Sequence, residues 1–303
     1  MDQDCVRRAW LTLGSSTIDL QDEAGGWFCT SLDLGYPEVR AVVNNRPDAH
    51  GIDDRTRYFG QRVVSADVVA VAAAGAVIDD VAENFAPFMV PSSRPTLHYV
   101  LDRPGTPERA IVLRASGYDW KVEGVDERNI HLQWVAADPA IYDATVQVAV
   151  SYAGSTTSAG RTYDLTFPRV YPTGGGVATT GRIQNDGDLD VNPLLRIYGP
   201  ITAPNIQFIV RPGNIGGANA YSTYVRFAAG FIIDAGHWVD VDTDAKTAYR
   251  DSDPAQPCFS SLNFAATTWA TIPPGHADMI LTGSGASNNI TQVQAFWQNA
   301  YLT

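Results

Sequence analysis

The chain has 303 residues, enough for one large or two ordinary domains with a substantial core. Hydrophobic residues make up 45% of it and charged residues only 18%, which indicates a folded protein and excludes extensive disorder. The formal net charge is −12 and neither half of the sequence is basic, so we expect no specific nucleic-acid binding.

The sequence carries no sign of a membrane segment or of a secretory leader. The longest apolar runs, such as residues 68–77, are too short and too rich in alanine to span a bilayer, so we expect no membrane insertion. The start, MDQDCVRRAW, lacks the basic and apolar regions of a signal peptide, so we expect folding in a cytosol. Cys5, Cys29 and Cys258 are odd in number and lack CxxC spacing, which predicts free thiols.

The N-terminal half is expected to be β-rich with a single helix. Polar, turn-rich sequence at 44–57 predicts an exposed loop. At 76–89, apolar residues recur at helical spacing and Pro87 and Pro91 close the run, which predicts the helix. β-prone sequence predicts strands at 9–13, 17–20, 63–69, 97–100, 110–114 and 131–135.

Two flexible stretches follow, SYAGSTTSAG at 151–160 and a glycine-rich run at 169–181. We therefore place a domain boundary in this region, with one domain at 1–165 and a second at 166–303.

The stretch 185–210 opens the second domain. Leu195 and Ile197 lie on one side of an extended segment, Gly199-Pro200 breaks it, and a second segment begins at Ile206. We expect these two strands to pair with each other. Further short strands separated by turns favour an antiparallel β-sandwich, and they are predicted at 221–227, 231–233, 238–242, 261–264, 278–281 and 291–297.

Motifs of catalysis and cofactor binding are missing. The sequence has no phosphate-binding GxxxxGK[ST] or GxGxxG loop, no GxSxG nucleophile elbow and no HExxH zinc motif. Its five histidines are scattered singly, and adjacent carboxylates such as Asp53-Asp54 are expected by chance among 33 acids. We therefore expect no enzymatic activity and no cofactor.

Two acidic clusters have spacings that could suit calcium. Asp240, Asp242 and Asp244 follow D-x-D-x-D spacing with Asp251 in the twelfth position, but Ala245 replaces the glycine of an EF-hand loop. The second cluster is Asp186, Asp188 and Asp190, in turn-like sequence. An acidic strand face and a polar turn explain both clusters, so we expect no metal at either.

The order of several short motifs resembles the distal tail protein family of long-tailed bacteriophages and, more loosely, their actinobacterial minor tail proteins. A "yGgR" strand entry lies at 58–62, "f-x-A-x-D-P-x-x-Y" at 135–142, and "N-x-G-x … P-x-[IL]-x-[IL]-x-G" at 185–199, followed by closing strands. The motif positions are Tyr58, Gly60, Arg62, Asp138, Pro139, Tyr142, Asn185, Gly187, Pro193, Gly199, Trp269, Pro274, Gly275 and Trp297.

This resemblance implies a mainly β protein with an N-terminal belt-like domain, containing one α-helix, and a C-terminal galectin-like sandwich. It implies a structural protein at the virion tail tip, made in the bacterial host cytoplasm. Six copies would form a ring between the tail tube and the baseplate hub and receptor-binding proteins, with the tape-measure protein and DNA passing through.

Two alternatives from other classes stay open at this point. A carbohydrate-binding, lectin-like module is one, because sandwich domains of this type include lectins. A glycosidase or esterase is the other, although no motif supports it.

Overall fold

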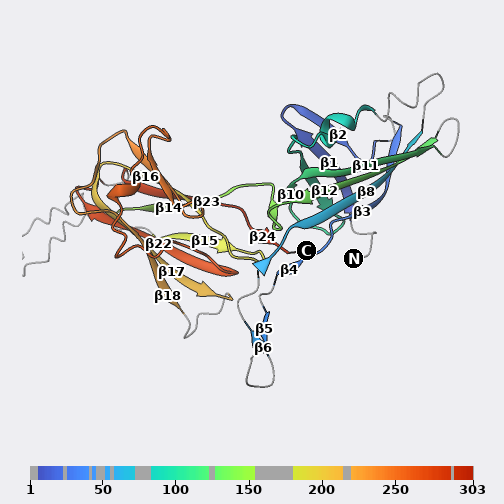
Figure 1. The fold of residues 1–303 in the computed structure, drawn as a ribbon. Coiled ribbons are helices and arrows are strands. Elements are labelled where there is room, and N and C mark those ends of the chain that lie inside the picture. Colours follow the sequence, from blue (N-terminus) through green and yellow to red (C-terminus); the bar gives the residue numbers. More distant parts are fainter. Residues whose placement is uncertain are drawn as a thin grey trace, which may run out of the picture. The chain divides into compact units, whose positions relative to one another are not determined.

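The computed structural model describes residues 6–22, 26–40, 43–45, 52–54, 58–71, 83–122, 127–153, 180–213, 220–287 and 290–302. The fold is mainly β and antiparallel, as the sequence predicts. No helix among these residues is long and apolar enough to cross a bilayer. The chain divides into two compact units, one formed by residues 1–145 and 301–303, the other by residues 146–300 (Figure 1).

The first unit contains two main sheets, of six and four strands. The six-stranded sheet has the order β2-β1-β9-β10-β13-β24, and its strands are β1 (Val6–Leu13), β2 (Ser16–Asp19), β9 (Thr96–Leu101), β10 (Arg109–Val112), β13 (Ile141–Asp143) and β24 (Ala300–Tyr301). The four-stranded sheet has the order β11-β12-β8-β3, and its strands are β3 (Trp27–Asp33), β8 (Arg62–Val71), β11 (Arg114–Val122) and β12 (Glu127–Ala136).

Side chains from both sheets form one hydrophobic core. In β8, the alternate residues Val64, Ala66, Val68 and Ala70 are buried, while those between them face outward. Leu11 and Leu97 contribute from the other sheet. The predicted strand at 63–69 is confirmed, and its alternating burial reflects a sheet with one covered and one open face.

The predicted loop at 44–57 proves to contain strands. β5 (Val43–Asn45) pairs with β6 (Ile52–Asp54), and β4 (Val39–Arg40) pairs with β7 (Tyr58–Phe59). Both short ladders lie between β3 and β8 in the chain (Figure 1). Residues 46–51 and 55–57 of the predicted loop lie outside the described residues. In the described part strands replace the loop, because main-chain pairing does not depend on an apolar side-chain pattern.

The predicted helix at 76–89 lies largely outside the described residues. In its described part, from residue 83 onward, the regular element is a 3-10 helix, η2 (Ala86–Met89). Pro87 lies inside this helix, where its missing N–H costs no hydrogen bond in a single turn. Phe85 and Phe88 are buried in the core, so the spacing of these apolar residues reflects core packing.

The second unit also has two antiparallel sheets, arranged in two layers (Figure 1). The sheet β14-β23-β16-β20-β21 contains β14 (Gln147–Tyr152), β16 (Leu194–Tyr198), β20 (Trp238–Asp242), β21 (Thr247–Arg250) and β23 (Gln292–Trp297). The sheet β15-β22-β17-β18 contains β15 (Gly181–Asn185), β17 (Ile201–Pro212), β18 (Tyr221–Arg226) and β22 (Gly275–Ser284), with β19 (Ile232–Ile233) paired to β17.

Two expectations about this unit were wrong. Strands β16 and β17 do not pair, because the chain passes from one sheet to the other at Gly199-Pro200. Gly199 permits this crossing, since a Cβ there would lie 2.2 Å from the carbonyl oxygen of Asp234. Residues 261–264 do not form a strand either, because the 3-10 helix η3 (Phe259–Ser261) and turns occupy this segment, with one bridge from Leu262 to Phe227.

The two units are joined at two points in the sequence. The chain enters the second unit after Thr145 and returns to the first at Tyr301. Strand β14, which lies before the boundary expected at residue 165, pairs with β23 of the second unit along its whole length.

Candidate assembly surfaces

Arg62 is a fully buried cation at the start of β8. Its guanidinium donates hydrogen bonds to four main-chain carbonyl oxygens, those of Pro139 (2.8 Å), Leu34 (3.2 Å), Gly35 (2.8 Å) and Leu302 (2.6 Å). Burial lowers the pKa of the guanidinium, chiefly by desolvation. Arg62 thus joins β8 to three segments that are distant in sequence, including the segment that returns from the second unit.

The motif residues 138–142 form a local turn beside Arg62. Asp138 accepts hydrogen bonds from the main-chain N–H of Ala140 (3.0 Å) and from the Tyr142 hydroxyl (2.7 Å). These bonds hold the segment in the conformation that presents the carbonyl of Pro139 to Arg62. Two motifs separated by more than seventy residues therefore meet at one hydrogen bond.

A second motif, which begins with Asn185 and Gly187, contacts the end of the second unit. Asn185 is buried, and its side chain donates to the carbonyls of Leu189 and Ile272 and accepts from the N–H of Gly187. Gly187 lies against Ala300. The carbonyl of Ala300 accepts hydrogen bonds from the N–H groups of Asp188 and Leu189. The motif therefore fixes the residue that precedes the return to the first unit.

Other motif positions have structural contacts as well. The Pro193 carbonyl accepts from the buried Thr243 hydroxyl (2.7 Å), and the Pro274 carbonyl accepts from the N–H of Gly213 (2.8 Å). Gly275 has a φ of +128°, Trp297 donates to the Gln184 carbonyl (2.9 Å), and Trp269 packs near the Phe259 ring. These contacts locate turns and strand ends.

The candidate metal ligands have other polar partners. Asp240 accepts two hydrogen bonds from Arg196 (2.7 and 3.0 Å) and one from Ser252. Asp242 accepts from the main-chain N–H groups of Asp244 and Ala245. Nowhere in the described ranges do three or more His, Cys, Asp or Glu side chains form a group suited to a metal ion.

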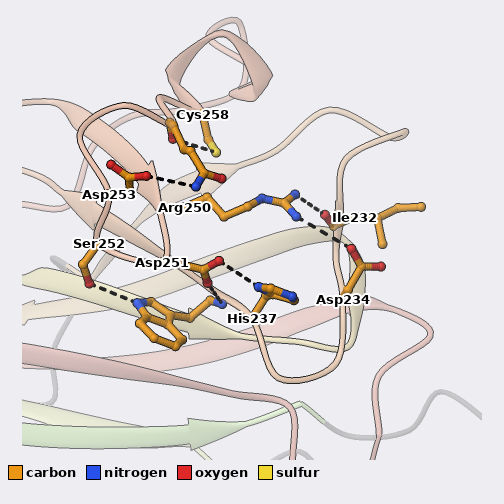
Figure 2. Close-up of polar contacts among 10 residues, drawn as sticks. Ile232, Asp234, His237, Arg250, Asp251, Ser252, Asp253 and Cys258 are labelled. Carbon is orange, nitrogen blue, oxygen red and sulfur yellow. Dashed lines mark hydrogen bonds and ion pairs between the residues drawn. The ribbon is translucent and has the colours of Figure 1, made fainter.

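Asp251, the twelfth position of the calcium-like pattern, belongs to a separate polar network (Figure 2). Its carboxylate accepts from the main-chain N–H of Trp238 (3.0 Å) and pairs with Nδ1 of His237 (2.7 Å). The Trp238 hydrogen bond, followed by that of His237, lowers the pKa of Asp251. Figure 2 shows Asp251 facing His237, and Arg250 reaching toward Ile232 and Asp234.

The first unit exposes apolar side chains beside β4 and β7, and we call Tyr36, Val39, Phe59 and Val63 the apolar patch. Tyr36 and Phe59 are 59% and 38% exposed. The rings of Tyr36 and Phe59 meet edge to face at 6.3 Å, and Phe59 pairs with Val39 across β4 and β7. Clustered exposed aromatic side chains on a soluble domain are typical of protein-binding surfaces.

The open face of the four-stranded sheet is mainly polar. Asp119, His131 and Asp67 lie opposite one another on β11, β12 and β8, and His131 Nδ1 lies 2.6 Å from Asp67 Oδ1. With Lys121 and Asn129 they line an open depression. The outer strands of the sheet are β3 and β11, and within the described residues each pairs in this sheet on one side only.

Sequence reasoning found Tyr58 and Arg62 but missed the apolar patch. Adjacent aromatic residues on short strands have the same pattern whether they are buried or exposed, so periodicity could not distinguish the two. The polar, turn-rich sequence around the patch was the available signal that these aromatic residues lie at the surface.

Comparison with solved structures shows the fold. Over 96% of this chain and 98% of the other, the structure matches the Dit protein of bacteriophage SPP1 with a TM-score of 0.63 at 11% identity. That protein is described as a paradigm of hub adsorption apparatus in phages that infect Gram-positive bacteria. A chain of the phage P2 baseplate in its activated conformation with Ca aligns over 96% and 97% of the two chains, with a TM-score of 0.48 at 13% identity.

No protein-family model matches the chain, and no curated protein matches it in sequence. The chain therefore has the fold of the SPP1 Dit protein over nearly its whole length.

Proposed function

We propose that this protein is a structural, non-enzymatic component of a bacteriophage tail tip, a distal tail protein whose six copies form a ring. The ring would join the tail tube to the baseplate hub and receptor-binding proteins. The tape-measure protein and DNA would pass through its channel. The observation that carries this proposal is the fold shared with the SPP1 Dit protein across both units.

The four-stranded sheet supports ring formation by its strand directions. Neighbouring strands in β11-β12-β8-β3 are all antiparallel, so the outer strands β11 and β3 run in opposite directions. When β3 of one copy lies beside β11 of the next, the new pair is also antiparallel. An even number of strands thus lets identical copies extend one continuous sheet, and a rotation between copies closes the ring.

The charge on the open face of the sheet suggests how such a ring would interact with DNA in its channel. The hydrophobic core covers one face of this sheet. The rest of the unit lies behind that face and needs the larger space outside the ring. The open face would therefore line the channel. The exposed acids on this face, at positions 33, 67, 119 and 127, outnumber the exposed bases Arg114 and Lys121. Such a channel would repel DNA weakly and let it pass.

The location is tested by immunogold electron microscopy of phage particles that carry this gene, with antibodies raised against the purified chain. We expect label at the end of the tail that is distant from the capsid. Label along the tail tube or on the capsid would contradict the proposal.

A further inference from the structure

We propose that the apolar patch binds Arg114 of the neighbouring copy in the ring, so that an arginine stacked on aromatic rings stabilises each contact between subunits. This inference rests on the proposed ring. It adds the residues that recognise the second copy, which the fold alone does not identify.

The registers in the sheet place Arg114 at the level of the patch. Arg114 lies opposite Val135, and Val135 lies opposite Val63. Gly35, which precedes Tyr36, lies against the carbonyl of Val63, where a Cβ would come within 2.2 Å. Arg114 and the patch therefore lie in the same row, at opposite edges of the sheet.

Head-to-tail pairing brings these two edges together. The C-terminal end of β3 would lie beside the N-terminal end of β11 of the next copy, because the two strands are antiparallel. Arg114 is the first residue of β11, and it is exposed. A register shift of two residues keeps Arg114 on the same face and moves it by about 6.6 Å, which is within reach of the long arginine side chain.

The patch has the chemistry that an arginine recognises. Tyr36 and Phe59 offer exposed aromatic rings for stacking with a guanidinium, and the exposed acids Asp33 and Glu38 flank the patch. Arginine combines a planar cation with an apolar stem, so it covers aromatic surface and pairs with a carboxylate at once.

The patch is also held in place before any partner arrives. The N–H of Gly60 donates to the Glu38 carbonyl at 2.6 Å, and the N–H of Gly35 donates to the Asp33 side chain at 2.8 Å. The Arg62 guanidinium donates hydrogen bonds to the carbonyls of Leu34 and Gly35, which directly precede Tyr36. A pre-organised surface loses little conformational entropy on binding.

The test uses two full-length variants, a patch variant (Tyr36→Ala with Phe59→Ala) and Arg114→Glu. Each alone should fall from a ring to monomers, because each subunit lacks one side of the contact. Mixed together, they keep one intact contact, between Arg114 of the patch variant and the patch of Arg114→Glu. Sedimentation should then show a 1:1 dimer, bound roughly tenfold or more tightly than either variant binds itself.

Two exposed positions away from this contact serve as matched controls, Tyr221→Ala and Arg103→Glu, which should assemble as the wild type does. If the patch variant and Arg114→Glu form rings like the wild type, the inference is wrong while the ring stands. If the mixture associates no better than each variant alone, it is also wrong. A wild-type protein that stays monomeric contradicts the ring, and the inference falls with it.

Discussion

The guanidinium of Arg62 donates a hydrogen bond to the carbonyl oxygen of Pro139, 2.8 Å away, and so connects the start of β8 with the turn that precedes β13. The same side chain binds the Leu302 carbonyl. A buried cation that is solvated by main-chain carbonyls rather than by water must be held in one geometry. Arg62 therefore acts as a structural centre of the first unit.

Replacing Arg62 by methionine should destabilise the protein strongly. Four carbonyl oxygens would lose their donor, and each buried acceptor left without one costs about 1–3 kcal/mol. We expect the free energy of unfolding to fall by roughly 3 kcal/mol or more, measured by urea denaturation. The exposed Arg103→Met is the control, and equal stability of the two variants would show that Arg62 has no such role.

Gly187→Ala should loosen the end of the second unit. A Cβ at this position would lie 2.2 Å from the Ala300 carbonyl oxygen, which is main chain and cannot move aside cheaply. We expect a loss of roughly 1–3 kcal/mol, as for other overpacked sites, with faster proteolysis near the C-terminus. Gly230→Ala is the matched control, since a Cβ there meets nothing within 4 Å. Similar behaviour of both variants would contradict the assignment.

Cys29 should resist alkylation at mildly alkaline pH. Burial raises the pKa of its thiol to about 11, so at pH 8 only about one molecule in a thousand carries the reactive thiolate. We expect iodoacetamide to label Cys29 slowly at pH 8 and faster as the pH rises toward 11. Peptide mass spectrometry measures the extent of labelling. Rapid labelling of the folded protein at pH 8 would argue against this burial.

Calcium should leave the protein unchanged. Asp240 is bound by Arg196 and Ser252, and Asp242 by two main-chain N–H groups, so a metal would have to displace existing partners. We expect the same thermal unfolding midpoint with millimolar calcium as with EDTA. A rise of several degrees in calcium would indicate a site in the native state.

The sequence predicted the mainly β class and most strand positions, because a sheet with one buried face imposes a period of two. Leu195 and Ile197 in β16, both fully buried, illustrate this. It could not predict that β16 and β17 lie in different sheets, since the crossing at Gly199-Pro200 resembles an ordinary hairpin turn.

Long-range contacts explain the rest of the difference. The motifs pointed to Arg62 and Pro139 separately, but their contact depends on the packing of distant segments. The same holds for Asn185 and Ile272, which are joined by a buried hydrogen bond across 87 positions of sequence. Local patterns report which residues are buried, whereas these polar contacts follow from the complete fold.

The most direct test of the proposed ring is the mass and shape of the purified full-length protein, by mass photometry with negative-stain imaging. Six chains of 32.7 kDa give about 196 kDa. We expect particles of this mass that have a central channel and show six-fold symmetry in averaged images. A monomer at every accessible concentration that also binds sugars would contradict the ring and favour a carbohydrate-binding module instead.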